Sequence, residues 1–339
     1  MDIERGLGTL DIAIFAIYVL IIIGVGLWVS RNKKGQQKNT EDYFLAGKSL
    51  PWWAVGSSLI AANISAEQFI GMSGSGFSIG LAISSYEWMS ALTLIIVGKY
   101  FLPIFIEKGI YTIPEFVEKR FNKNLKTILA VFWIALYIFV NLTSVLYLGG
   151  LALETILGIP LMWSIIGLAA FALIYSIYGG LSAVVWTDVI QVFFLVLGGL
   201  VTTWMAVHFI GGDDGWFSGF SKMAAAAPDH FEMILDPGNP QYANLPGIAV
   251  LIGGLWVANL YYWGFNQYII QRTLAAKSVA EAQKGIVFAA FLKLIVPFLV
   301  VIPGIAAWVI TSSPELMARM GEIATHNMPT LAHADKAYP

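Results

Sequence analysis

An apolar run at residues 61–76 carries polar groups at positions where a membrane-spanning helix normally has only apolar residues. The run holds two amides, one carboxylate and three glycines, from Asn63, Glu67, Gln68, Gly71, Gly74 and Gly76. In hydrocarbon every backbone amide and carbonyl must be bonded internally, so an unwound polar stretch survives only where protein or a water-filled cavity surrounds it. The pattern is typical of a transporter binding site. The alternative interpretation is that these side chains only form hydrogen bonds between helices and so stabilise helix packing.

Ionisable side chains also occur inside two later apolar runs. Glu87 and Ser90 lie three residues apart, so they share one face of a helix in the run 82–105. Lys293 lies inside the run 286–310. A charge in a span is by default a functional hypothesis, although a lysine near the inner end could also extend its amine to the interface.

A further polar stripe lies in the run 248–270. Asn259, Tyr262 and Asn266 follow spacings of three and four, with Trp263 beside them, so the sequence predicts one helical stripe. Asp188 begins a sixth run and either caps a helix or lines an ion path. Amides, carboxylates, a cation and flat aromatic rings together favour a carbohydrate ligand over an amino acid.

The composition indicates that long membrane-spanning helices position these groups. Hydrophobic residues make up 58% of the chain and charged residues 12%, whereas soluble domains are about one quarter charged. The mean hydropathy is +0.74. With about 20 apolar residues needed for one span, eight spans are predicted, at residues 10–29, 52–79, 82–105, 127–149, 161–177, 183–210, 248–270 and 286–310.

The basic residues predict the orientation of these spans. Of the 19 Lys and Arg residues, 13 fall in the segments 30–51, 106–126 and 271–285, and four fall in the segments on the other side. By the positive-inside rule the three basic segments are cytoplasmic and the N-terminus is outside. The segment 211–247 is then an external loop, for which we expect a solvated cap without chemistry.

Several functional classes find no support in the sequence. The chain has no cysteine, so thiolate metal sites and disulfides within it are excluded. Its net charge of −2 favours no nucleic-acid partner. The four histidines lack the spacing of metalloprotease ligands, and we expect no enzymatic activity; they are His208, His230, His326 and His333.

Four segments resemble the sodium/solute symporter family. They are the run 42–53, the interrupted segment 63–68, the stretch 178–188 and the stretch 266–272. The resemblance covers essentially the whole chain, and the four motifs together are highly specific. It implies an all-α polytopic membrane protein with the LeuT-type fold, which has two inverted five-helix repeats and a leading extra helix.

The resemblance also implies a division of the chain. Residues 1–30 would form the leading transmembrane helix, 52–210 the first repeat, 211–247 the external loop, 248–310 the first two helices of the second repeat, and 311–339 an external segment. The second repeat would be incomplete within these 339 residues. We therefore expect a fragment whose remaining sodium and sugar ligands lie beyond residue 339.

Roles for individual residues follow from the same resemblance. Sugar hydroxyls would be bound by Gln68, Glu87, Ser90, Asn259 and Lys293, with Asn63 close by. Tyr262 would stack on the pyranose ring as the inner gate, held by Asn63 and backed by Trp263. The backbone carbonyls of Ala61 and Ile64 would contribute to a sodium site, and Asp188 would serve the sodium exit path.

The function implied is sodium-coupled sugar symport by alternating access, for galactose or glucose, in the bacterial inner membrane. Its partners would be the sugar, the sodium ion and the lipid bilayer. Two alternatives remain open at the level of sequence. A facilitator would carry sugar without sodium dependence, and a membrane sensor would need a signalling domain beyond the present C-terminus.

Overall fold

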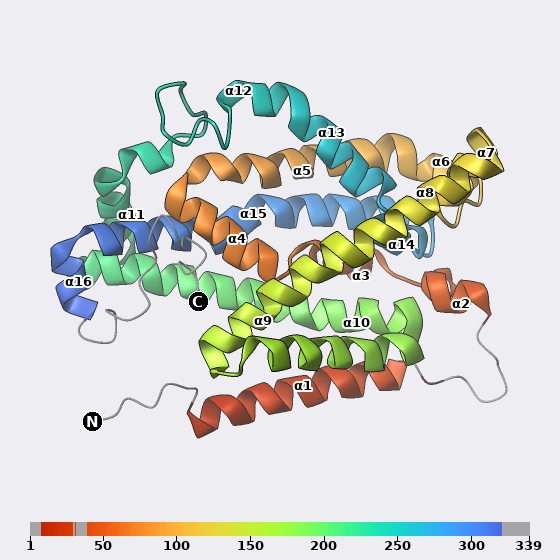
Figure 1. The fold of residues 1–339 in the computed structure, drawn as a ribbon, viewed down its shortest axis with the longest axis horizontal. Helices are drawn as coiled ribbons and strands as arrows, with labels where there is room; N and C mark the ends of the chain where they lie inside the picture. The colour runs from red at the N-terminus through yellow and green to blue at the C-terminus, as the bar shows by residue number, and fades with distance from the viewer. Residues whose placement is uncertain (1–7, 30, 32–38, 321–339) are drawn as a thin grey trace. The chain divides into compact units, whose positions relative to one another are not determined.

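Helices account for nearly all of the described chain. The computed structural model describes residues 8–29, 31 and 39–320, and its ribbon is drawn in Figure 1. The first helices are α1 (Thr9–Val29), α2 (Thr40–Leu45), α3 (Trp52–Asn63), α4 (Ala66–Ser78), α5 (Ser85–Ile96), α6 (Leu102–Glu107), α7 (Ile113–Arg120) and α8 (Lys123–Leu136). They are followed by α9 (Thr143–Leu157), α10 (Leu161–Gly211), α11 (Gly215–Ala226), α12 (Gly247–Ala249), α13 (Leu255–Leu260), α14 (Gln267–Leu274), α15 (Val279–Ser312) and α16 (Pro314–Met320).

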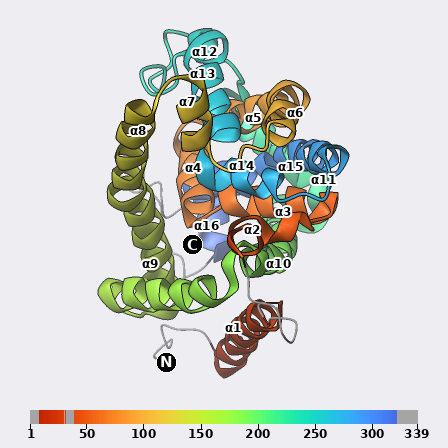
Figure 2. The same cartoon turned by 90° about the vertical axis from the view of Figure 1, so that its right-hand side faces the viewer.

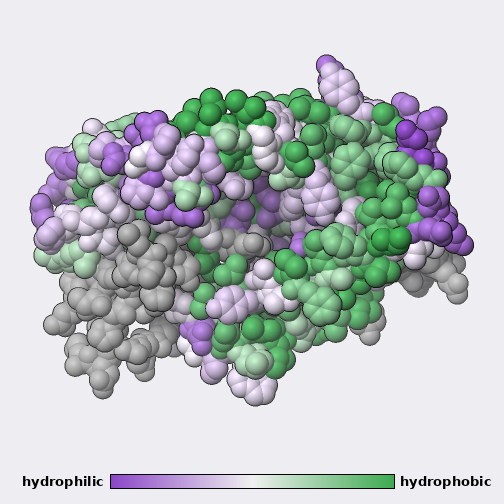
Figure 3. Space-filling model, turned by 45° about the horizontal axis from the view of Figure 1, so that its top comes forward, coloured by the Kyte–Doolittle hydropathy of each residue, from purple (hydrophilic) through white to green (hydrophobic). Residues whose placement is uncertain are grey.

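Six helical stretches in the described residues are long and apolar enough to cross a membrane. They are Thr9–Val29, Leu81–Glu107, Lys123–Thr155, Gly179–Ala226, Gly247–Phe265 and Val279–Ser312. A shorter apolar stretch covers Leu161–Ile174. Helices α8 and α9 are joined by the π-helical turn Tyr137–Leu142 and form one continuous stretch, as Figure 2 shows. Hydrophobic side chains cover much of the face drawn in Figure 3. The predicted multi-span, all-α fold is confirmed.

The predicted span 52–79 is broken in the middle. Helix α3 ends at Asn63, and Ile64 has the extended dihedrals φ −86° and ψ 101°. Helix α4 begins at Ala66. A β-branched residue between an asparagine and a serine weakens helix propagation at this point. The side chain of Glu67 is outside the described part of the chain, and so are the residues of the predicted external segment after Met320.

A second break interrupts the predicted span 248–270. The five residues Tyr261–Phe265 form a π-helical turn, and Asn266 is extended with φ −82° and ψ 120°. Single π turns inside α-helices are frequent at functional sites. The prediction that Asn259, Tyr262 and Asn266 form one helical stripe is therefore wrong, because the wider turn changes the phase and the helix stops at Asn266.

The helical hydrogen bonding of α10 passes through a sharp turn at Gly180. Its dihedrals of φ 61° and ψ −158° are accessible essentially only to glycine. A Cβ at this position would also lie 2.6 Å from the carbonyl oxygen of Tyr43. The hydroxyl of Tyr43 donates to the carbonyl of Ile177 at 3.1 Å. Helix α2 is thereby attached to the turn that separates the predicted spans 161–177 and 183–210.

The chain forms two compact units, and several long helices contribute to both. Unit 1 consists of Met1–Ala66, Leu94–Val192 and Tyr261–Ala289. Unit 2 consists of Glu67–Thr93, Phe193–Leu260 and Ala290–Pro339. The three segments predicted to be cytoplasmic belong to unit 1, and the predicted external loop belongs to unit 2.

Two close backbone contacts fix the packing of unit 2. A Cβ at Gly304 of α15 would lie 2.1 Å from the carbonyl oxygen of Ser73, and a Cβ at Gly76 of α4 would lie 2.6 Å from that of Val301. Any larger residue would force the two helices apart. Because Gln68 and Lys293 lie on these helices, the contact sets the spacing of the predicted site residues.

In unit 1 the start of α3 is tied to α14 and α15. The amide of Leu50 donates to the carbonyl of Ala275 at 3.2 Å, and the amide of Lys277 donates to the carbonyl of Leu50 at 3.1 Å. The amide of Trp52, which has no intrahelical acceptor, donates to a carboxylate oxygen of Glu281 at 2.9 Å. These bonds anchor the start of α3, the end of α14 and the start of α15 to one another.

Candidate functional site

Unit 2 brings three of the predicted sugar-binding residues together around one carboxylate. The ammonium of Lys293 donates to Oε2 of Glu87 at 2.5 Å. The amide nitrogen of Gln68 donates to Oε1 of the same carboxylate at 2.5 Å. Lys293 is 0% and Glu87 is 4% exposed. The interpretation that Lys293 extends its amine to the interface is wrong, because this amine is fully buried and paired with Glu87.

Ser90 and Asn259 form a second polar pair in unit 2. The hydroxyl of Ser90 lies 2.6 Å from Oδ1 of Asn259 and 2.7 Å from the carbonyl oxygen of Tyr86, so its single proton is donated to one of them. The amide nitrogen of Asn259 donates to the carbonyl of Leu255 at 3.0 Å. Both side chains are buried. Five of the predicted sugar-binding residues are thus buried or half-buried polar groups of one unit.

This arrangement can bind a hydroxyl-rich molecule. Amides and serine hydroxyls donate and accept, the carboxylate accepts, and the ammonium donates, so each hydroxyl of a sugar could find a partner. A buried ion pair contributes little to stability compared with apolar residues of the same volume. Stability alone therefore does not explain an ion pair between these helices.

Unit 1 holds the predicted gate residues. The amide nitrogen of Asn63 donates to the hydroxyl of Tyr262 at 3.0 Å, and that hydroxyl lies 3.0 Å from the hydroxyl of Tyr268. The rings of Tyr262 and Trp263 meet edge to face, with 5.1 Å between centroids. Asn63 is the last residue of α3, and Tyr262 lies in the π turn. The hydrogen bond therefore joins the two helix breaks.

Asp188 is the centre of a buried ionic cluster in unit 1. Ser58 donates to Oδ2 of Asp188 at 2.5 Å. Nε of Arg272 donates to Ser58 Oγ at 2.8 Å, and Nη2 of Arg272 lies 3.5 Å from Oδ2 of Asp188. Asp188 lies well inside α10, so the interpretation as a helix cap is wrong.

The cluster is connected to the gate through Tyr268. Nη1 of Arg272 donates to the backbone carbonyl of Tyr268, whose hydroxyl contacts Tyr262. Neither Arg272 nor Ser58 was predicted as a site residue from the sequence. The available signal for Ser58 was a pair of serines, Ser57 and Ser58, inside an apolar run.

The predicted sodium ligands lie at the break after α3. The last carbonyls of a helix lack intrahelical donors, and the extended conformation of Ile64 ends the series of donors that the carbonyl of Ala61 would otherwise meet. Such oxygens suit a hard cation. Within the described residues no three His, Cys, Asp or Glu side chains cluster as metal ligands, so a cation site here would rest on carbonyls and hydroxyls.

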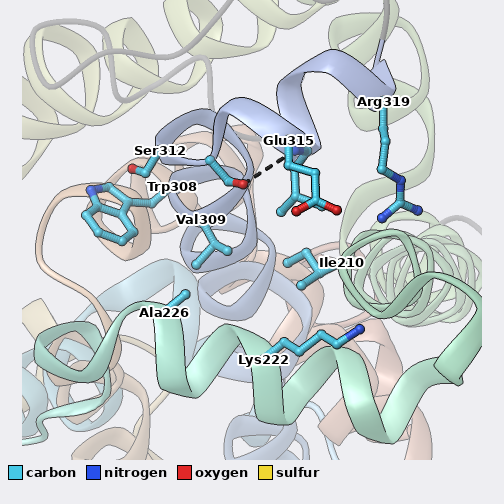
Figure 4. Close-up of a pocket in the computed structure, with 10 residues that line it drawn as sticks. Ile210, Lys222, Ala226, Trp308, Val309, Ser312, Glu315 and Arg319 are labelled. Carbon is cyan, nitrogen blue, oxygen red and sulfur yellow. Dashed lines mark hydrogen bonds between the residues drawn. The ribbon is translucent and has the colours of Figure 1, made fainter.

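A cavity of about 500 Å³ in unit 2 is separate from these groups. It lies where α10 ends and α11, α15 and α16 meet (Figure 4). Its cations have partners, since Lys222 pairs with Asp214 at 2.7 Å and Arg319 lies 4.9 Å from the centre of the Phe209 ring. None of the predicted sugar-binding residues lines it.

Comparison with known proteins gives a consistent result. A model of the sodium:solute symporter family matches residues 43–335. The sodium/glucose cotransporter of Vibrio parahaemolyticus is 86% identical over 338 residues, which are 100% of this chain and 62% of that protein. The sodium/myo-inositol cotransporter 2 of Bos taurus is 35% identical over 319 residues, which are 91% of this chain and 46% of that protein.

A solved structure shows the same fold. It is the substrate-bound, outward-open state of a Na⁺-coupled sialic acid symporter, with a TM-score of 0.81 and 24% identity. The alignment covers 98% of this chain and 66% of that chain. The likeness confirms the predicted LeuT-type fold. The chain spans less than two thirds of the length of each of these relatives. Both the family model and the relatives show that it belongs to the sodium:solute symporter family.

Proposed function

We propose that the complete protein is a sodium-coupled sugar symporter of the galactose or glucose class that works by alternating access. The observation that carries the proposal is the buried Glu87–Lys293 pair with Gln68 bound to the same carboxylate. Ionisable groups in a span are costly and mark substrate pathways. The names of the similar cotransporters support sodium and a polyol or sugar as the transported pair.

In this proposal the side chains of unit 2 bind sugar hydroxyls. Glu87 accepts, Lys293 donates, and the amides of Gln68 and Asn259 do both, while Ser90 orients Asn259. A sugar must replace the existing hydrogen bonds among these groups, so the free energy of breaking them opposes sugar binding. Asn63 and Tyr262, with Trp263 behind the tyrosine, are proposed as the inner gate.

Sodium is proposed to act at the helix break. The carbonyls of Ala61 and Ile64 would bind it, which stabilises the end of α3 two residues or fewer from Asn63. Since Asn63 donates to Tyr262, sodium occupancy would change the gate. Asp188 would receive the ion on its way to the cytoplasm. Thermodynamic linkage then requires sodium and sugar to raise each other's affinity by the same factor.

The proposed location is the bacterial inner membrane, with the N-terminus outside. The concentration of basic residues in the segments 30–51, 106–126 and 271–285 supports this orientation.

Counterflow in liposomes tests the proposal. The complete protein is reconstituted, and uptake of several labelled sugars is measured with sodium and with choline in its place. Sodium-dependent uptake of galactose or glucose is expected. Equal uptake in both buffers would indicate a facilitator, and binding without uptake would favour the sensor interpretation.

A further inference from the structure

Unit 1 contains a cavity of about 690 Å³ that the proposed transport site does not use. It lies between α2, the turn that precedes α7, and α14. Its volume falls in the range of about 300–1,000 Å³ that is typical of small-molecule sites. All of its lining residues except Gln267 belong to the three segments whose basic residues predict a cytoplasmic location, and Gln267 lies four residues before the third of them.

Two glutamines on one face of α14 present fixed polar groups to this cavity. Oε1 of Gln267 accepts from the backbone amide of Ile113 at 2.8 Å. Nε2 of Gln271 donates to the backbone carbonyl of Phe44 at 2.6 Å. These bonds determine the orientation of both amides, because a backbone amide needs an acceptor and a carbonyl needs a donor.

The opposite end of each amide remains available to a ligand. Gln267 can offer its nitrogen as a donor, and Gln271 can offer its oxygen as an acceptor. The two residues are one helical turn apart, with about 5–6 Å between their Cβ atoms. A ring with hydroxyls on opposite sides could therefore contact both.

Apolar and acidic side chains complete the wall. Phe44 is 53% and Tyr111 is 40% exposed, so part of each side chain is not covered by the protein. The ammonium of Lys48 lies over the Tyr111 ring, 4.8 Å from its centre, which leaves the opposite face for a ligand. The hydroxyl of Tyr111 lies 3.4 Å from Oε2 of Glu41, and Lys48 lies 3.5 Å from the other oxygen of that carboxylate. The charge of Glu41 is thus balanced, which favours an uncharged ligand.

We propose that this cavity is a second, weaker binding site for an uncharged polyhydroxylated ring, such as a monosaccharide on the cytoplasmic side. The aromatic faces would cover the apolar face of the ring, and the two glutamines would bind hydroxyls. The choice of a sugar rests on the proposed function. Binding should not depend on sodium, because none of Ala61, Ile64 and Asp188 lines the cavity.

Protection of an introduced thiol tests the second site. Thr40 lines the cavity and is exposed, and residues 1–339 contain no cysteine. Thr40→Cys is made in the complete protein after any other cysteines are replaced, and also in a Glu87→Gln/Lys293→Met background that removes the proposed transport site. Galactose in sodium-free buffer is expected to slow alkylation in both backgrounds. A thiol from the exposed Asn124→Cys should show no protection.

A matched pair of glutamine variants identifies the contact. Gln271→Leu is expected to weaken the protecting effect of galactose about fivefold, which is the loss of one hydrogen bond. Gln283→Leu is the control, since Gln283 also donates to a backbone carbonyl, that of Gly98 at 3.0 Å, but does not line the cavity. The control should leave protection unchanged.

The two proposals fail in different ways. If galactose does not slow alkylation at Thr40→Cys in either background, the second site is wrong, whatever the transport measurement shows. Equal weakening by Gln271→Leu and Gln283→Leu would also overturn it. If the parent protein shows no sodium-dependent sugar uptake, the proposed transport function is wrong, and protection in sodium-free buffer is still measured independently.

Discussion

Neutralising both members of the Glu87–Lys293 pair should separate a folding role from a binding role. At 2.5 Å and an effective dielectric constant of about 20, two unit charges attract with roughly 7 kcal/mol. Desolvation offsets part of this attraction. Lys293→Met alone leaves a buried carboxylate without its cation, which typically costs about 3–5 kcal/mol.

The double variant Glu87→Gln/Lys293→Met should behave differently. It removes both charges and keeps similar side-chain volumes, and a glutamine at position 87 can still bond to Gln68. The free energy of unfolding should return to within about 1–2 kcal/mol of the parent, because neutral replacements of buried ion pairs are often tolerated. Sugar affinity should stay reduced by roughly 5- to 150-fold per lost hydroxyl contact.

The assay is a double-mutant cycle on two observables. Thermal unfolding in detergent reports stability, and equilibrium binding of labelled galactose in sodium buffer reports the site. The reasoning is refuted if the double variant binds sugar as the parent does, since the pair would then serve only helix packing. It is also refuted if Lys293→Met alone leaves the unfolding temperature unchanged.

Three further predictions follow from the same structure. Asn259→Ala should weaken sugar binding by about 1–3 kcal/mol while Thr143→Ala, on α9 in unit 1, leaves it unchanged in the same binding assay. A single cysteine in the segment 106–126 should resist an impermeant thiol reagent in intact cells and react in inverted vesicles; ready labelling from outside would reverse the proposed topology. Burial lowers the pKa of His230, whose ring nitrogen lies 3.0 Å from the carbonyl oxygen of Phe77. The unfolded chain therefore binds the proton more readily than the folded chain does. The free energy of unfolding should fall as the pH decreases below the ordinary histidine pKa of 6.5. As the pH decreases through this range, the unfolding temperature of the parent should fall more than that of His230→Gln, and parallel curves would contradict the assignment.

The sequence predicted the spans and the first helix break because both depend on local composition. Apolar length determines a span, and the polar, glycine-rich segment after Ala61 signals the interruption. The second break at Asn266 was not predicted, since the spacing of Asn259 and Tyr262 fits an ordinary helix. A π turn changes that phase by one residue, and no local residue type requires it.

Partners far apart in the chain could not be predicted from spacing. Glu87 and Lys293 were each identified as candidates, but 206 residues separate them, and only the packing of α5 against α15 brings them together. The same holds for Asp188, Ser58 and Arg272, which come from three helices. Sequence alone left a cap and an ion path as equal alternatives for Asp188.

The backbone contact between α4 and α15 has a consequence for how substrate range can change. At Gly76 and Gly304 the two helices touch through main-chain atoms, so their separation does not depend on the length of the side chains in the proposed site. Gln68 or Lys293 can then be replaced without moving α4 relative to α15, provided that the charges in the site remain balanced. If the proposed site is correct, its solute range could change through the ends of these side chains, whereas a single methyl group at Gly304 would push α4 and α15 apart and change the distance between Gln68 and Lys293.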